Sequence, residues 1–149
     1  MAALNNRMLT LKTNYNSSNQ IVIISIITAM KAVEESEYKE YRIVIDTFHH
    51  AIGPDNLEKL SNEYDIKLTG IIHISAVTSE ISREEYKDEN RNIDFVNDKL
   101  KSKAQIEYFV KNGYDGIISF EPFARDLQQL DKEELKNIID KAIKYLTTR

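Results

Sequence analysis

Short apolar, β-branched segments alternate with helix-length segments along most of this chain, and this alternation constrains the fold more than any other feature. Residues 41–46, 68–74 and 116–121 have the length and composition of buried strands. Strands that alternate with helices are typical of a parallel sheet built from βα units. Because these strands are nearly continuous apolar runs, we expect both of their faces to be covered.

Helix-length segments with suitable caps complete the pattern. Four segments have helical spacing of apolar residues: 18–36, 54–64, 101–112 and 132–146. Ser17 or Ser18 can cap the first helix, Asp131 can cap the last, and Gly113 can end the third. Residues 75–98 are polar and irregular, so we predict a long loop there.

The length of the chain limits how much of a larger fold it can form. No low-complexity tract or Pro/Gly-rich linker divides it, so residues 1–149 are predicted to form a single domain. A complete eight-stranded (β/α) barrel takes about 250 residues. With three clear strands and a short fourth over residues 8–12, this chain can supply about four βα units. The predicted fold class is therefore α/β, a partial (β/α) TIM barrel with parallel strands.

The composition argues against several classes of protein. The net charge of −4 and the pI of about 5.4 do not favour a nucleic-acid partner. The absence of cysteine excludes a disulfide framework and a thiolate metal site, and it fits a reducing cytoplasm. The strongest apolar run, residues 21–30, is shorter than the roughly 20 residues that cross a bilayer. We predict a cytoplasmic protein in which this run is a buried helix and no segment enters a membrane.

Each of the three clear strands ends in an ionisable residue. Asp46 ends the first and is followed by His49, His73 lies near the end of the second, and Glu121 ends the third. In parallel α/β folds the carboxyl ends of the strands form the active-site face. Carboxylate oxygens and imidazole nitrogens placed there suit a divalent metal. The alternative is that these are polar strand ends that hydrogen-bond to loops.

The segments around these residues resemble one family. IVIDTFHHAIGP (43–54), IIHIS (71–75) and GYDGIISFEPF (113–123) resemble, in order and spacing, strand-end motifs of the xylose isomerase-like TIM barrel superfamily. This superfamily includes sugar phosphate isomerases and epimerases, inosose isomerases and the family 2 apurinic (AP) endonucleases. The resemblance covers about residues 42–146 and corresponds to the C-terminal half of the barrel only.

The resemblance implies roles for five residues. Asp46, His73 and Glu121 match metal ligands, and the implied cofactor is a divalent metal such as Mn, Co, Zn or Mg. Glu121 also matches the catalytic acid/base that moves a proton beside a carbonyl group. His49 matches a catalytic-site residue that contacts substrate oxygens. Arg91 matches a loop arginine that contacts substrate in some members.

Other positions depart from the family pattern. The fourth metal ligand, a glutamate, would fall at Met1 or Ala2, and Ala76 stands where many members have an aspartate. Asn90 and Asn92 stand where the nucleases have two further ligands. The four N-terminal strands have no counterpart in these residues. An open half-site with three ligands should bind a metal loosely. A site without metal is therefore the alternative to the metal-bound site.

These observations leave three functions to be compared. The first is a metal-dependent sugar or sugar-phosphate isomerase or epimerase, truncated and inactive on its own. The second is a non-catalytic remnant of a split gene that retains only the fold. The third, an apurinic endonuclease, is least favoured because of Asn90 and Asn92.

A half barrel exposes two strand edges, which invite pairing. We therefore expect a homo-oligomer or a separate N-terminal half-barrel chain as partner, and a small-molecule sugar as substrate.

Overall fold

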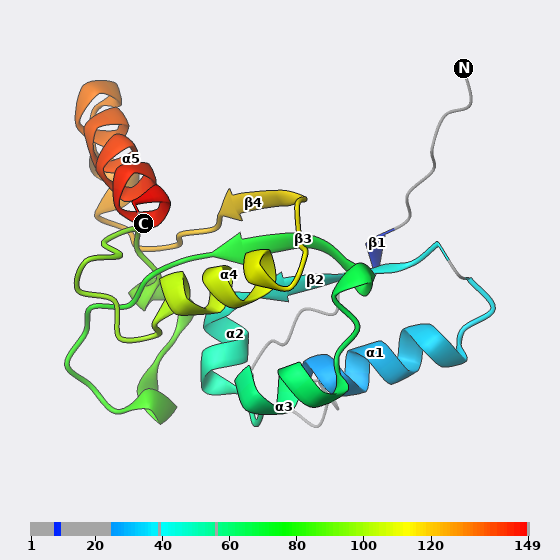
Figure 1. The fold of residues 1–149 in the computed structure, drawn as a ribbon. Helices are drawn as coiled ribbons and strands as arrows, with labels where there is room; N and C mark the ends of the chain where they lie inside the picture. The colour runs from blue at the N-terminus through cyan, green and yellow to red at the C-terminus, as the bar shows by residue number, and fades with distance from the viewer. Residues whose placement is uncertain (1–7, 10–24, 39, 56, 149) are drawn as a thin grey trace, which may run out of the picture.

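The computed structural model describes residues 8–9, 25–38, 40–55 and 57–148 (Figure 1). None of the helices in these ranges has the length and apolarity that spanning a bilayer requires. The position predicted for a fourth metal ligand, most of the predicted first strand and the predicted caps of the first helix lie outside the described residues.

A parallel sheet of four strands forms the centre of the structure (Figure 1). The strands are β1 (Met8–Leu9), β2 (Arg42–Asp46), β3 (Thr69–Ile74) and β4 (Ile117–Phe120), paired in that order. Every pairing is parallel. Neighbouring parallel strands joined by helical crossovers are the arrangement of a (β/α) barrel. The structure therefore confirms the predicted partial barrel.

Helices connect the strands and follow the last one. The α-helices are α1 (Ile26–Glu35), α2 (Thr47–Ile52), α3 (Leu57–Glu63), α4 (Ser102–Lys111) and α5 (Lys132–Thr147). Short 3-10 helices span Ile66–Leu68, Arg83–Glu85, Asp88–Asn90 and Leu127–Gln129. In Figure 1, α1, α2 and α3 lie below the sheet, and α5 stands beyond the end of β4. The sequence did not predict α2.

Side-chain caps explain where several helices begin and end. The side chain of Ser25 accepts a hydrogen bond from Thr28 N and caps α1, which begins at Ile26. Residues 18–24 of the predicted helix lie outside the described residues. Asp131 accepts from the first-turn amides of α5, and Glu134 accepts from Asp131 N at 3.0 Å, which completes a capping box. Gly113, after α4, has a φ of 98°, a left-handed conformation that suits glycine. The caps predicted at Asp131 and Gly113 are confirmed.

The hydrophobic core lies between the helices and one face of the sheet. Ile45 of β2 and Ile72 of β3 are fully buried and pack in one cluster with Leu60 of α3 and Phe109 of α4. A fully buried side chain of this size contributes about 1.5–3 kcal/mol through removal of its apolar surface from water. These contacts fix the helices on β2 and β3, and thereby fix the strand ends.

The last strand is not covered in the same way. Ile117 is 67% exposed and Ile118 is 38% exposed, although both lie on β4. The prediction that both faces of each strand are covered is therefore wrong for β4 within the described part of the chain. β4 is also an edge strand of the four-stranded sheet. An apolar edge strand of this kind is a place where a further strand can pair.

A single carboxylate organises the end of the long loop. Asp98 Oδ1 accepts hydrogen bonds from Val77 N and Leu100 N, both at 2.9 Å. Its Oδ2 accepts from Ser102 N, the first residue of α4, at 2.7 Å. The negative charge also interacts favourably with the amino end of the helix. Asp98 therefore joins the loop that follows β3 to the start of α4.

Replacement of Asp98 by alanine is expected to lower the free energy of unfolding by about 1–3 kcal/mol, because the substitution leaves partly buried backbone N–H groups without an acceptor. Urea unfolding followed by circular dichroism measures the change. The matched control is Asp94→Ala on the same loop, since Asp94 is exposed and accepts from the side chain of Asn97. This control should change the free energy by about 0.5 kcal/mol or less. Equal effects of the two substitutions would contradict the role assigned to Asp98.

Candidate functional site

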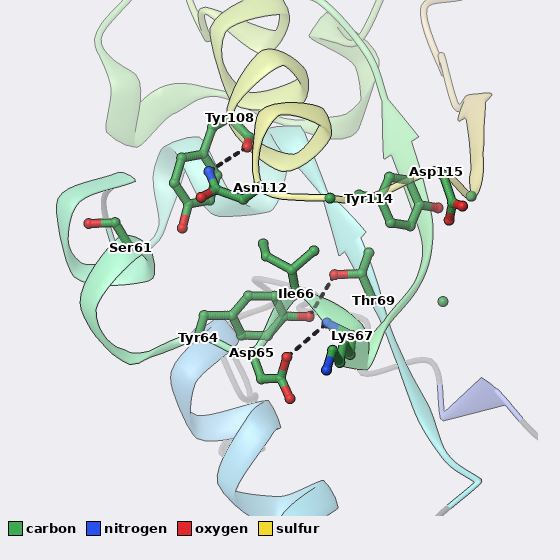
Figure 2. Close-up of a pocket in the computed structure, with 13 residues that line it drawn as sticks. Ser61, Tyr64, Asp65, Ile66, Lys67, Thr69, Tyr108, Asn112, Tyr114 and Asp115 are labelled. Atoms are coloured by element: carbon green, nitrogen blue, oxygen red, sulfur yellow. Dashed lines mark hydrogen bonds between the residues drawn. The ribbon is translucent and has the colours of Figure 1, made fainter.

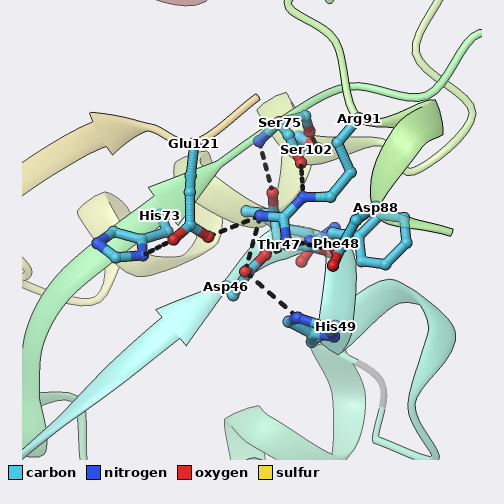
Figure 3. A network of polar contacts seen from close by, with 11 residues as sticks. Asp46, Thr47, Phe48, His49, His73, Ser75, Asp88, Arg91, Ser102 and Glu121 are labelled. Carbon is cyan, nitrogen blue, oxygen red and sulfur yellow. Dashed lines mark hydrogen bonds and ion pairs between the residues drawn. The ribbon is translucent and has the colours of Figure 1, made fainter. Parts of the chain in front are cut away.

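The strand register places Asp46, His73 and Glu121 on the same face of the sheet (Figure 3). Asp46 pairs with His73 across β2 and β3, and His73 pairs with Ser119 across β3 and β4. Because side chains alternate between the two faces, Glu121, two residues after Ser119, lies on the same face. Glu121 N donates to Ile74 O at 2.8 Å and extends the ladder beyond β4. The structure thus brings the three predicted ligands to neighbouring strand ends.

Asp46 both ends a strand and starts a helix. Its Oδ1 accepts a hydrogen bond from Phe48 N at 2.9 Å and caps α2 directly after β2. Its Oδ2 lies 2.9 Å from Arg91 Nη2 and 3.7 Å from His49 Nε2. His49 reaches Asp46 because the two residues are one helical turn apart. The helix that the sequence did not predict is therefore what brings His49 to the site.

His73 and Glu121 form a second polar contact at the strand ends. His73 Nδ1 lies 3.2 Å from Glu121 Oε1. The side chains of Asp46, His49, His73 and Glu121 are between 12% and 22% exposed. They are partly enclosed, and solvent still reaches them.

Arg91 lies between the two carboxylates (Figure 3). Its Nη2 donates to Asp46 Oδ2 at 2.9 Å and to Glu121 Oε2 at 2.7 Å. Its Nε donates to Ser75 Oγ at 3.1 Å, and its Nη1 donates to Asp88 Oδ1 at 3.2 Å. One guanidinium thus ties the ends of β2, β3 and β4 to the long loop.

Two phenyl rings and a backbone tether complete the surroundings of Arg91. The guanidinium carbon lies 5.0 Å from the ring centroid of Phe48 and 4.8 Å from that of Phe123. The Arg91 carbonyl accepts from Phe123 N at 2.9 Å and from Ala124 N at 2.8 Å. Ring faces and charged oxygens both stabilise a desolvated cation. Arg91 is only 2% exposed, so these contacts replace the water that a free guanidinium would bind.

Burial and the neighbouring cation set the protonation of the carboxyl groups. Burial raises the pKa of Asp46 to about 7, although the Arg91 guanidinium opposes this rise. Burial alone would also raise the pKa of Glu121, but its hydrogen bonds with Asp46 and Arg91 outweigh this effect and lower the pKa. Near neutral pH the pair therefore contains an ionised Glu121 and an Asp46 that can carry a proton.

Solved structures share this architecture, although no protein-family model and no curated protein matches the chain. A xylose isomerase domain-containing protein from Salmonella typhimurium LT2 matches with a TM-score of 0.78 and 25% identity, over 82% of this chain and 44% of that one. The chain has the xylose isomerase-like fold. This finding confirms the resemblance drawn from the strand-end motifs.

Two further solved structures with the xylose isomerase-like fold match less closely in sequence. The IolI protein, solved with a bound zinc atom, has a TM-score of 0.65 and 24% identity, over 79% of this chain and 41% of its own. D-Psicose 3-epimerase from Clostridium cellulolyticum H10, solved with D-tagatose, has a TM-score of 0.66 and 13% identity, over 95% of this chain and 48% of its own. The chain therefore spans less than half the length of each of the three proteins.

Loop residues at the predicted nuclease-ligand positions make other contacts in this xylose isomerase-like fold. Asn90 Nδ2 donates to Ser79 Oγ at 3.3 Å, and Asn92 Nδ2 donates to Thr78 Oγ1 at 3.1 Å. The backbones of Ala76 and Asn92 exchange two hydrogen bonds of 2.8 Å. Both amides therefore help to fold the loop.

The strand-end donor set does not fit a metal in this arrangement. Among the residues that the structure describes, no three His, Asp or Glu side chains are placed to hold a metal ion. Arg91 Nη2 already bonds one oxygen of Asp46 and one oxygen of Glu121, and His73 Nδ1 faces the other oxygen of Glu121. The ligand roles of Asp46, His73 and Glu121 remain predictions, as do the substrate-contact roles of His49 and Arg91.

Some residues around the site were not predicted from the sequence. Phe48 and Phe123, which enclose Arg91, each lie two residues after a strand-end carboxylate, Asp46 or Glu121. This repeated spacing is the signal that could have identified them. The adjacent His50 is buried, and its Nδ1 forms a 2.6 Å hydrogen bond with Gln105 of α4. Burial lowers the pKa of His50, which favours its neutral form.

Proposed function

We propose that this chain forms half of a sugar isomerase- or epimerase-like barrel and that its strand ends bind a sugar or sugar phosphate. The observation that carries the proposal is the placement of Asp46, His73 and Glu121 on one face, at the carboxyl ends of neighbouring parallel strands. This is the active-site face of (β/α) barrels. One protein with the same fold is an epimerase solved with D-tagatose.

The accessible atoms of the site suit a ligand rich in hydroxyl groups. Carboxylate oxygens of Asp46 and Glu121 accept hydrogen bonds, whereas the imidazoles of His49 and His73 can donate or accept. Sugar hydroxyls do both, so they can pair with either kind of group. Two carboxylates disfavour a phosphate directly beside them. The neutral carbon chain of the sugar therefore lies at the strand ends, and any phosphate lies away from them.

Glu121 is the residue that takes and returns a proton in this proposal. Sugar isomerisation and epimerisation remove a proton from a carbon beside a carbonyl group. The C–H bond breaks, the proton moves to Glu121 Oε1, and the carbonyl oxygen takes the proton of Asp46, which gives an enediol. Glu121 then returns its proton to the former carbonyl carbon, and the other hydroxyl of the enediol loses its proton to Asp46. A carbonyl forms at the neighbouring carbon, and both side chains regain their starting states. Arg91 acts as a positioning residue because it holds both carboxylates.

Calorimetric titration of the purified chain with D-tagatose tests the proposal. Glu121→Gln is expected to weaken binding about tenfold or more, because hydrogen bonds to a charged group contribute about 1.5–3 kcal/mol. Glu89→Gln, an exposed substitution on the long loop, serves as the matched control. Circular dichroism checks that both variants fold. Absence of D-tagatose binding, or equal binding by the two variants, would contradict the proposal.

A non-catalytic chain that retains only the fold is the second candidate. The observation that favours it is Arg91, which already satisfies one oxygen of each carboxylate inside the protein. Such a site is stable without a ligand. A folded chain that does not bind D-tagatose would support this candidate over the isomerase.

A further inference from the structure

We infer that the guanidinium of Arg91 takes the place of the divalent metal, so that the strand-end site of this chain is metal-free. The inference deepens the proposed function, since it names the cation of the same site. Its physical basis is independent of sugar binding, because it concerns how two neighbouring carboxylates are neutralised. The starting point is that Arg91 bonds the carboxylates that the family resemblance assigns to metal binding.

The oxygens that a metal would need are already used. Zinc binds carboxylate oxygens at about 2.0–2.2 Å. Arg91 Nη2 instead lies 2.9 Å from Asp46 Oδ2 and 2.7 Å from Glu121 Oε2. A metal held by the same two oxygens would lie next to a guanidinium that is always charged, and the two cations would repel each other. Arg91 and a metal therefore compete for this position.

Arg91 is also fixed, so it cannot easily move aside for a metal. Its Nε and Nη1 bond Ser75 and Asp88, and its guanidinium lies over the rings of Phe48 and Phe123. Displacement would break these hydrogen bonds and expose the faces of both rings. A side chain with this many directed contacts is part of the folded core of the site.

The third predicted ligand is engaged as well. His73 Nδ1 lies 3.2 Å from Glu121 Oε1, so the second oxygen of Glu121 also has a partner. Two oxygens of Glu121 thus bind one guanidinium and one imidazole. This arrangement neutralises the carboxylate without a metal.

Titration with Mn²⁺ and with Zn²⁺ tests the inference by calorimetry and by metal analysis after dialysis. The wild-type chain is expected to retain no stoichiometric metal, and about 1 mM Mn²⁺ should leave its thermal unfolding unchanged. Arg91→Ala should bind Mn²⁺ about tenfold more tightly or better, because the competing charge is gone. Arg83→Ala, which changes an exposed arginine of the same loop, should remain like wild type.

Two results would overturn the inference. The first is one equivalent of metal on the wild-type chain that Glu121→Gln removes. The second is a folded Arg91→Ala variant that binds Mn²⁺ no better than wild type. If Arg91→Ala does not fold, the wild-type titration decides alone: no metal supports the inference and site-bound metal overturns it. Failure to bind D-tagatose would count against the proposed function and leave the metal result intact.

Discussion

Replacement of Arg91 by methionine is expected to lower the free energy of unfolding by roughly 3–5 kcal/mol. The substitution keeps much of the apolar volume between Phe48 and Phe123 and removes the charge. Asp46 and Glu121 then remain partly buried without their shared donor. A buried charge that loses its partner is strongly destabilising, because its hydration is not restored. Urea unfolding monitored by circular dichroism measures the loss.

A matched substitution separates this effect from a general loss of positive charge. Arg83→Met changes an exposed arginine whose Nη2 donates to Gly53 O at 3.2 Å, and it should alter stability by about 0.5 kcal/mol or less. In a Glu121→Gln background, Arg91→Met should be less destabilising than in wild type, because one of the charges left behind is absent. Equal effects of Arg91→Met in the two backgrounds would contradict the coupling between these residues.

The strands and the strand-end residues could be predicted because their signals are local. Residues 42–46, 69–74 and 117–120 are short apolar runs, and an ionisable residue at the end of such a run is visible in the sequence itself. The parallel order then follows from the alternation with helices. Asp46 and His73 were therefore expected at the carboxyl ends of the strands. The register makes them directly paired neighbours on β2 and β3.

The position of Arg91 could not be predicted, because its partners are distant in sequence. Asp46 lies 45 residues before it and Glu121 lies 30 residues after it. The loop that carries Arg91 has no periodic pattern, and its shape depends on tertiary contacts such as those of Asp98. The resemblance implied a substrate contact for Arg91. Its burial between the carboxylates became visible only in three dimensions.

The exposure of β4 has a physical explanation in the incomplete barrel. In a closed barrel, one face of each strand points into the interior and each strand pairs on both edges. The solved structures with this fold are more than twice as long as the part that this chain matches. Ile117 and Ile118 therefore lie where a closed barrel would cover them. We propose that a second copy of this chain provides this cover, because its β1 edge can continue the parallel order after β4.

The 149-residue chain is accordingly expected to self-associate at about 10 µM. The substitution Ile117→Lys should weaken this association about tenfold or more, because it would bury a charge at the new contact. Light scattering after size-exclusion chromatography measures the mass of the assembly. Val96→Lys is the matched control, since Val96 is also 67% exposed but lies in the long loop and not on the sheet edge. A stable wild-type monomer, or equal loss of association in both variants, would contradict pairing through β4.

Pairing would enclose the open face that carries Asp46, His73 and Glu121, so sugar binding should then increase with protein concentration.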